Sequence, residues 1–284
     1  FSKGLNLYLE HSDIVKPHVM KAEAILEFNN IILKIEDSIA TLSLNRPDAL
    51  NALSVELLNE FYEATLQVKA DQSVKALLIR GEGRAFCAGA DLLYFESILD
   101  DLQFMPEYVN LLNKCLSQLE LLPVPTIALV QGFALAGGLE LMLACDMAIV
   151  AEDARIGDQH ANYGLMPGGG STQRLPRRVG LQRAMELLTT GRWISGIEAV
   201  DWGLALKAAS IDSLEEVVDT LLDSLRNKSR VGLSMIKSVT YRGQDLSLAD
   251  GLALEGMAFV QLFATSDHPR QGIEAFKEKK QPDF

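Results

Sequence analysis

A strand-like segment that runs into two adjacent glycines and then into a helical pattern constrains this chain more than any other feature. The segment Thr126–Val130 is apolar, Gly137 and Gly138 follow it, and an apolar periodic run containing Glu140 comes next. Adjacent glycines let the backbone turn tightly and approach a ligand closely. A helix that starts there leaves N–H groups without partners, which favours an oxygen that becomes negative. The run therefore predicts an enzyme site with a backbone donor beside a carboxylate.

The composition indicates an acidic globular protein. The chain has 284 residues, of which 48% are hydrophobic, and this is enough for a large core in one or two domains. A formal net charge of -12 argues against nucleic acid as the main partner, because such binding normally needs a basic face. Cys87, Cys115 and Cys145 stand in apolar contexts without a Cys-x-x-Cys spacing, which is typical of reduced core cysteines in a cytoplasmic protein.

No segment predicts a membrane span or a secretory signal. The sequence has no run of about 18 uncharged apolar residues, so we expect no membrane span. Residues 1–21 lack a basic stretch followed by an apolar one, so we expect no signal peptide. A cleaved organelle transit segment stays open, because Phe1 is an unusual first residue. The expected location is the cytoplasm, with an organelle matrix as the alternative.

The apolar pattern divides the chain into three parts. Residues 1–27 look like an N-terminal extension with a helix around 19–28, residues 28–205 like a core that alternates strands and helices, and residues 206–284 like a helical C-terminal region. Alternating strands and helices predict an α/β class. The expected strands are 31–35, 39–44, 74–79, 126–130 and 147–150. The expected helices are one capped by Ser54, then 97–122, 181–189, 196–202, 214–227, 231–241 and 246–264.

Two further segments carry candidate chemistry. In the first, Ala88, Gly89 and Ala90 follow a predicted strand, and such small residues let a ligand lie against backbone N–H groups. The second runs from Ile156-Gly-Asp-Gln-His160 to a run of three glycines that ends at a predicted helix start. Taken alone, the first segment is a weak signal, because small-residue turns after strands are mostly structural.

Five motifs stand in a fixed order along the chain. They are Asn45-Arg-Pro-x-x-x-Asn51-Ala-Leu, Ala85-Phe-Cys-Ala-Gly-Ala-Asp91, Gly132-x-Ala-x-x-Gly-Gly138-x-Glu-Leu, Ala144-Cys-Asp146 and Pro167-Gly-Gly-Gly-x-Thr-Gln-Arg174-Leu. Together they resemble the crotonase, or enoyl-CoA hydratase/isomerase, superfamily. Two later segments, Gly191-Arg-Trp-Ile-Ser195 and Phe276-Lys-Glu-Lys-Lys280, extend the resemblance over roughly 28–284. The resemblance is highly specific for the fold and much less specific for the reaction.

The resemblance implies a crotonase-like spiral of ββα turns, with a C-terminal helical layer that drives homotrimers or dimers of trimers. It implies an acyl-CoA substrate whose thioester oxygen lies between the backbone N–H groups of Ala88 and Gly137. Coenzyme A is then part of the substrate, and no separate cofactor or metal is expected. Other residues expected to bind the substrate are Ala90, Asp91, Leu92, Gly138, Pro167 and Gly168. The candidate cations for the CoA phosphates are Arg46, Arg84, Lys277, Lys279 and Lys280, and the expected pocket walls are Tyr94, Phe95, the region 97–110 and Tyr163.

The second catalytic position departs from the family pattern. Hydratases of the family use two carboxylates, one at the position of Glu140 and one at the position that here holds His160. A neutral imidazole can still orient water and carry a proton near neutral pH, but it adds no second negative charge. Asp158 is an alternative source of a carboxylate if the loop bends.

Three functions stay open at this point. The first is an enoyl-CoA hydratase-like lyase in which Glu140 is the acid/base and His160 fills the second catalytic slot. The second is an enoyl-CoA isomerase, or a hydrolase of C–C or C–S bonds, which needs one carboxylate only. The third is a non-catalytic acyl-CoA-binding scaffold in which His160 marks decay. The retained Glu140 and the two small-residue turns favour an enzyme.

Overall fold

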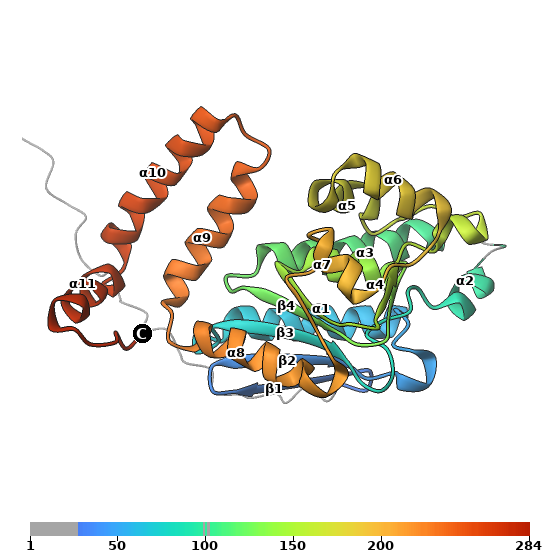
Figure 1. The fold of residues 1–284 in the computed structure, drawn as a ribbon, viewed down its shortest axis with the longest axis horizontal. Coiled ribbons are helices and arrows are strands. Elements are labelled where there is room, and N and C mark those ends of the chain that lie inside the picture. The colour runs from blue at the N-terminus through green and yellow to red at the C-terminus, as the bar shows by residue number, and fades with distance from the viewer. Residues whose placement is uncertain (1–27, 99, 101–102) are drawn as a thin grey trace, which may run out of the picture.

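A six-stranded sheet forms the centre of the molecule. The computed structural model describes residues 28–98, 100 and 103–284. The strand order is β1-β2-β3-β4-β6-β8 (Figure 1), and only β1 and β2 pair antiparallel while the other neighbours pair in parallel. These strands are β1 (Ile31–Glu36), β2 (Ile39–Leu44), β3 (Ala76–Gly81), β4 (Thr126–Val130), β6 (Met147–Ala151) and β8 (Lys207–Ala209).

A second, smaller sheet lies beside the first. Its strands β5 (Phe133–Leu135) and β7 (Arg155–Gly157) pair in parallel, and single bridges join Cys87 to Ala134 and Ile156 to Ile194. Each of β3, β4 and β6 is therefore followed within a few residues by a short segment in the second layer. This repeat is the expected spiral of ββα turns, and the predicted fold class is confirmed.

Helices fill the connections between the strands. In the core they are α1 (Val55–Ala70), α2 (Leu92–Ile98), α3 (Phe104–Leu121), α4 (Gly137–Ala144), α5 (Ser171–Val179), α6 (Leu181–Thr190), α7 (Gly196–Asp201) and α8 (Leu214–Arg226), with short 3-10 turns η1 (Pro47–Ala49), η2 (His160–Tyr163) and η3 (Ile211–Ser213). The Ser54 hydroxyl caps α1 by accepting the Leu57 N–H over 3.2 Å, as the sequence predicted.

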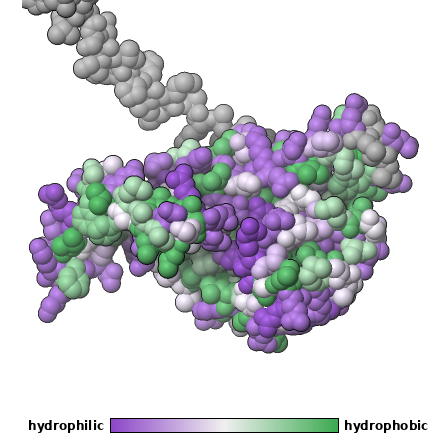
Figure 2. All heavy atoms as spheres, turned by 90° about the horizontal axis from the view of Figure 1, so that it is seen from above, coloured by the Kyte–Doolittle hydropathy of each residue, from purple (hydrophilic) through white to green (hydrophobic). Residues whose placement is uncertain are grey.

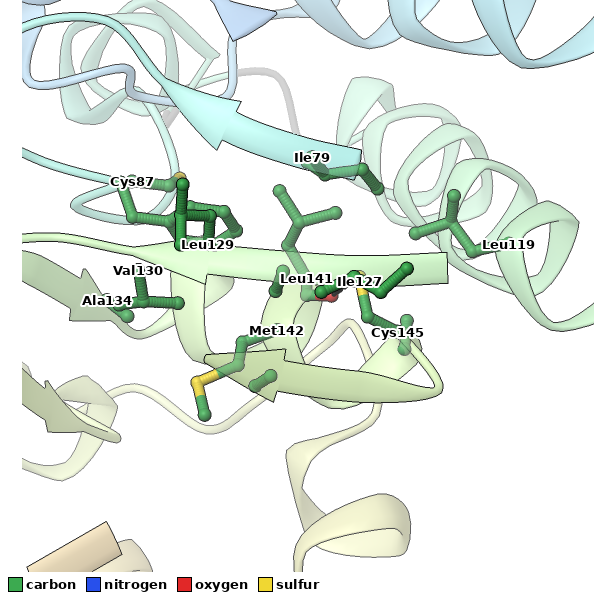
Figure 3. Close-up of a cluster of buried hydrophobic side chains, with 14 of the residues drawn as sticks. Ile79, Cys87, Leu119, Ile127, Leu129, Val130, Ala134, Leu141, Met142 and Cys145 are labelled. Atoms are coloured by element: carbon green, nitrogen blue, oxygen red, sulfur yellow. Dashed lines mark hydrogen bonds between the residues drawn. The ribbon is translucent and has the colours of Figure 1, made fainter. Parts of the chain in front are cut away.

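The strand β4 and the helix α4 form the middle of the core. All five residues of β4 and all eight of α4 are buried. Figure 3 shows Leu141 and Met142 of α4 in one cluster with Ile127 and Leu129 of β4. Such all-round burial explains why both segments read as continuous apolar runs rather than as alternating patterns. It also fixes the position of the one acid in α4.

The three cysteines are buried in this core without disulfides. Burial raises the pKa of the Cys87, Cys115 and Cys145 thiols to about 12, so they are neutral at physiological pH. A neutral buried thiol is a poor nucleophile. They are packing residues, as their apolar contexts indicated.

Most predicted elements agree with the structure, and the elements that were not predicted include the shortest strands and the helix at 268–278. The five expected strands are present within two residues, whereas β5, β7 and β8 have three residues each and were not predicted. The expected helix 97–122 is two helices, α2 and α3. Pro106 is the third residue of α3, in the first turn, where a helix tolerates proline best, so a start of α3 shortly before it is favoured. The extension 1–27 and the helix expected around 19–28 lie outside the described residues, apart from Phe28.

The last three helices project from the core as an arm, α9 (Arg230–Gly243), α10 (Leu248–Thr265) and α11 (His268–Glu278) (Figure 1). The buried Lys237 anchors α9, because its Nζ pairs with Asp146 over 2.8 Å and donates to the Leu119 and Val124 carbonyls over 2.7 and 3.1 Å. The predicted boundary at 205 needs a correction. β8 is an edge strand of the main sheet and α8 packs on it, so the projecting part begins at α9.

The helix α10 contacts α9 but exposes most of its apolar surface. Leu254, Ala258 and Leu262 are half-buried at four-residue spacing, and no residue of α10 is buried. Figure 2 shows apolar surface along this arm. Within the part of the chain that the structure describes, α10 is the one helix long and apolar enough to cross a membrane by length and composition alone, although it contains Asp250 and Glu255. Such a surface equally suits contact with another protein.

Candidate active site

The start of α4 is a strained turn that frees a backbone donor. Ala136 has a φ of 48° and a ψ of -116°, a conformation that a non-glycine residue adopts only at a cost of about 1–3 kcal/mol. Its N–H donates to the Gly157 carbonyl and its carbonyl accepts the Glu140 N–H, each over 3.0 Å, and these bonds hold the turn. Gly137 is the first residue of the helix, so its N–H has no partner inside the helix.

The Ala88 amide is not the second donor. Its N–H donates to the Leu50 carbonyl over 3.0 Å. A bonded N–H of this kind offers nothing to a substrate oxygen, so the structure corrects the expectation drawn from the motif. The hydrogen bond of Ala88 instead joins the segment before α2 to the turn after η1.

The Ala90 amide fits the role better. The Leu53 N–H donates to the Gly89 carbonyl over 2.8 Å and the Asp91 N–H donates to the Leu53 carbonyl over 3.3 Å. In such a bridge the residue between the two bonded neighbours turns its own N–H to the opposite side, so the Ala90 N–H points away from Leu53. A Cβ placed on Gly137 would lie 3.4 Å from the Ala90 nitrogen. The Ala90 and Gly137 amides therefore border one small space.

The glycine at 138 serves packing. A Cβ there would lie 2.0 Å from the Cys87 carbonyl oxygen, so only glycine lets α4 approach this segment. Gly138 was expected to contact the substrate, but it is buried against Cys87. Its contribution to the site is the close seating of α4, which brings Gly137 and Ala90 together.

Glu140 is a buried carboxylate that two backbone amides hold. Glu140 is 1% exposed. Its Oε1 accepts the Gly169 N–H over 2.7 Å and the Ser171 N–H over 3.2 Å. Burial raises the pKa of Glu140, and the two amides and the charge of His160 reduce that rise. A carboxylate with a raised pKa takes up a proton more readily, as a general base near neutral pH must.

The glycine run after Pro167 forms the cradle for this carboxylate. A Cβ on Gly169 would lie 2.6 Å from Glu140 Oε2, so the side chain fits only beside glycine. The Gly168 carbonyl accepts from the Asn113 side chain over 2.8 Å. Arg174 braces the loop by donating to the Gly169 carbonyl over 2.7 Å. The expected substrate contacts of Pro167 and Gly168 stay predictions, and the contacts of this segment with Glu140 are the Gly169 and Ser171 amides.

His160 and Asp158 form a pair at the end of β7. His160 Nδ1 lies 2.7 Å from Asp158 Oδ1, and the same oxygen accepts the His160 backbone N–H over 3.2 Å. Burial alone lowers the pKa of His160, but the hydrogen bond and charge of Asp158, together with the charge of Glu140, outweigh it and raise that pKa. The charge of Glu140 adds to the rise in the pKa of His160, and the charge of His160 partly offsets the rise in the pKa of Glu140.

Aromatic side chains stand behind the Ala90 turn. The ring centroids of Tyr94 and Phe95 lie 5.6 and 4.8 Å from that of Tyr108, and the Tyr108 hydroxyl donates to the Leu53 carbonyl over 2.9 Å. Burial raises the pKa of Tyr108, and the charges of Cys87 and Glu140 add to that rise. By contrast, Leu92 and Tyr163 are 61% and 71% exposed and lie on the outside.

The candidate phosphate-binding cations fall into three groups. Arg46 is already paired, because it contacts Asp91 over 2.8 Å and donates to the Ala52 carbonyl over 2.6 Å. Arg84 is exposed on the loop that leads to Ala88 and Ala90. The tail lysines Lys277, Lys279 and Lys280 lie on or just after α11, which Figure 1 shows at the opposite end of the molecule from α2, so a single chain does not bring them to the site.

Several features of the candidate site were missing from the sequence interpretation. They are the Ala90 donor, the two amides on Glu140 and the Asp158–His160 pair. The Asp-x-His spacing was a usable signal for the pair. Among residues 28–98, 100 and 103–284, no group of three or more His, Cys, Asp and Glu side chains is arranged to hold a metal ion.

Comparison with known proteins agrees with this geometry. The family model for enoyl-CoA hydratase/isomerase matches residues 34–284. A probable enoyl-CoA hydratase of Bacillus subtilis (strain 168) is 38% identical over 259 residues, which cover 90% of this chain and 98% of that protein. The crotonyl-CoA hydratase of Syntrophomonas wolfei is 35% identical over 260 residues, covering 91% of this chain and 99% of that protein. The crystal structure of an enoyl-CoA hydratase from Bacillus anthracis is 34% identical, covers 90% of this chain and 99% of that one, and has a TM-score of 0.86.

These matches run through both layers of the spiral and through the turn that carries Gly137 and Glu140. They extend over nearly the full length of each relative, so no separate domain accounts for them. The chain belongs to the enoyl-CoA hydratase/isomerase family.

Proposed function

We propose that this enzyme adds water across the α,β-double bond of an enoyl-CoA thioester. Glu140 takes a proton from water, the water oxygen bonds to Cβ, and the electron pair moves through Cα to the thioester oxygen. The Ala90 and Gly137 N–H groups stabilise that enolate oxygen, and a proton then reaches Cα from the second slot at His160. Donors of this kind typically lower the barrier by about 2.7–4 kcal/mol each.

One observation carries the proposal. Glu140 is a buried carboxylate whose Oε1 accepts the Gly169 N–H over 2.7 Å, and it lies one helical turn after Gly137, whose N–H has no partner inside the helix. Chemistry beside a carbonyl group needs a base and an oxyanion donor in this proximity. The crotonyl-CoA hydratase named among the relatives favours a short enoyl-CoA as the first substrate to test. Coenzyme A would enter with the substrate, and the proposal needs no resident cofactor.

A second candidate follows from the imidazole in the second slot. Isomerisation of a β,γ-enoyl-CoA, or hydrolysis of a C–C or C–S bond in an acyl-CoA, needs only one carboxylate, and here Glu140 is the one that two amides hold in place. His160 would then bind the substrate or a water molecule.

An assay with two substrates tests both candidates. Crotonyl-CoA and a β,γ-enoyl-CoA are incubated separately with wild type, Glu140→Gln and the exposed control Glu63→Gln, and products are identified by mass. Gain of one water on crotonyl-CoA, lost in Glu140→Gln and kept in Glu63→Gln, supports hydration. Conversion of the β,γ-isomer alone supports isomerisation. Binding of acyl-CoA without turnover, unchanged in Glu140→Gln, contradicts both and supports a non-catalytic binder.

We also propose that the arm joins subunits into a homotrimer or a dimer of trimers. The support is the exposed apolar surface of α10, where Leu248, Phe259 and Val260 are 80%, 63% and 67% exposed. Monomeric proteins rarely leave a large contiguous apolar surface open to water. Assembly would also give the tail lysines a route to a neighbouring subunit's CoA phosphates, and Arg84 is the candidate within the chain.

A further inference from the structure

The carboxylate of Asp158 has no task in the reaction proposed above, although it lies in the site. The residue is 0% exposed, whereas the side chain of His160 is 14% exposed. Asp158 Oδ1 lies 2.7 Å from His160 Nδ1, and Oδ2 is buried without a hydrogen-bond partner among the described residues. Burying a carboxylate is costly unless its charge is compensated, so the imidazole is the group that compensates it.

The contact decides which imidazole nitrogen can work. A carboxylate oxygen only accepts hydrogen bonds, so the proton in the 2.7 Å contact belongs to Nδ1. Nε2 is then the nitrogen left to accept or donate a proton. The His160 backbone N–H, 3.2 Å from the same oxygen, holds the ring close to the carboxylate.

We propose that Asp158 is the positioning residue of the second catalytic slot: it keeps the proton on Nδ1 of His160, so that Nε2 exchanges protons with the substrate. The proposal rests on the proposed function only in giving His160 a part in turnover. Asp158 itself acts through the imidazole, because no part of its side chain reaches the surface of the site.

The charges around the ring favour the protonated imidazole. Asp158 and Glu140 face it, and both raise its pKa against the effect of burial. Helix α6 also packs against η2, but its charged residues are engaged elsewhere, Arg183 with the Trp202 carbonyl and Glu186 with Arg192. A protonated His160 is a general acid, the complement of Glu140 as base.

A purely structural role for Asp158 makes a different prediction. If the carboxylate only shaped the loop, an asparagine side chain would serve equally well, because an amide oxygen also accepts both N–H groups. The Asp158→Asn variant removes the charge and keeps the shape, so it separates the effect of the charge on His160 from the shape of the loop. Asp153→Asn is the matched control, because Asp153 is exposed and lies two residues before β7.

The first test is an NMR titration of 15N-histidine-labelled protein. The signal of His160 is assigned among those of the four histidines by its loss in His160→Gln. We expect the neutral His160 of the wild type to carry its proton on Nδ1, and its pKa to fall by about one unit or more in Asp158→Asn but not in Asp153→Asn. A proton on Nε2 in the wild type overturns the proposal, and so does an unchanged pKa in a folded Asp158→Asn. The tautomer needs no variant, so the test holds even if Asp158→Asn fails to fold.

The second test is kinetic. The alkaline limb of the pH–rate profile should move to lower pH in Asp158→Asn, and kcat should fall about 10- to 100-fold, within the range of general acid–base catalysis. Adding Asp158→Asn to His160→Gln should cause no further loss, because the two residues act as one unit. An equal loss at every pH, or a further loss in the double variant, contradicts the proposal. Absence of turnover in the wild type contradicts the proposed function alone, because the NMR titration still decides the role of Asp158.

Discussion

The helices α4 and α10 are both apolar, but they are stabilised in different ways. Every residue of α4 is buried within its own chain, and its one acid is held by two backbone amides. No residue of α10 is buried, and Leu252, Phe259 and Val260 are 58%, 63% and 67% exposed. The carboxylate and the two amide donors of the candidate site therefore come from one chain, whereas α10 leaves its apolar surface exposed. Substitutions in the two regions should separate chemistry from assembly.

The largest expected effect is at Gly137. A Cβ there would already lie 3.2 Å from Leu53 and 3.4 Å from the Ala90 nitrogen, so the side chain of Gly137→Val fills the space between the two amides. We expect kcat to fall about 10²- to 10³-fold, the cost of losing an oxyanion donor, while cooperative thermal unfolding is retained. The control is Gly243→Val at the end of α9, where a Cβ meets nothing within 4 Å. Normal turnover in Gly137→Val would contradict the oxyanion site.

The second effect is on the attachment of the arm. Lys237→Ala removes the partner of Asp146 and leaves the Leu119 and Val124 carbonyls without their donor. Breaking a buried pair in this way costs about 3–5 kcal/mol, so we expect early loss of α9 protection in hydrogen exchange. The exposed Lys228→Ala serves as the control. Equal protection of α9 in both variants would mean that other contacts hold the arm.

The third effect concerns stability and pH at Glu140. Burial raises the pKa of Glu140 in the folded chain, so the stability linked to its proton is present below the ordinary glutamate pKa of about 4.3 and is lost as pH rises through the raised value. Glu140→Gln avoids this loss. We expect the inactive variant to melt at a higher temperature than wild type near about pH 7 and at a similar one below about pH 4. A lower melting temperature at neutral pH would mean that the charged carboxylate stabilises the fold.

The sequence predicted the elements with many apolar residues and missed those defined by a few backbone bonds. The strands β3, β4 and β6 are apolar runs that burial requires, and they were found. β5 and β7 have three residues each, too few for any periodic pattern. Their place in the second layer depends on pairings between segments that are distant in sequence, which local patterns do not show.

Because local patterns do not show backbone pairing, the sequence also predicted only part of the candidate site. The motif identified Glu140 and Gly137 because glycine and carboxylate are informative residue types. Choosing Ala90 over Ala88 depends on which N–H is already bonded, since that of Ala88 donates to the Leu50 carbonyl and that of Ala90 points away from Leu53; this is a property of pairing rather than of residue type. The contact of Asp158 with His160 depends likewise on how the backbone turns after β7.

The smallest effect on the stability of the core is expected from substitutions in the arm. Leu252→Asp with Phe259→Asp places two charges on the exposed face of α10, and surface changes of this kind alter the free energy of unfolding by about 0.5 kcal/mol or less. If α10 joins subunits, sedimentation should show the assembly of wild type dissociating into monomers in this variant, while Gln261→Glu on the same helix stays assembled. Because Ala90, Gly137 and Glu140 all belong to one chain, the monomers should keep turnover of a short enoyl-CoA. Loss of turnover on dissociation would show that a neighbouring subunit contributes to the site, and an unchanged mass would mean that α10 serves another surface.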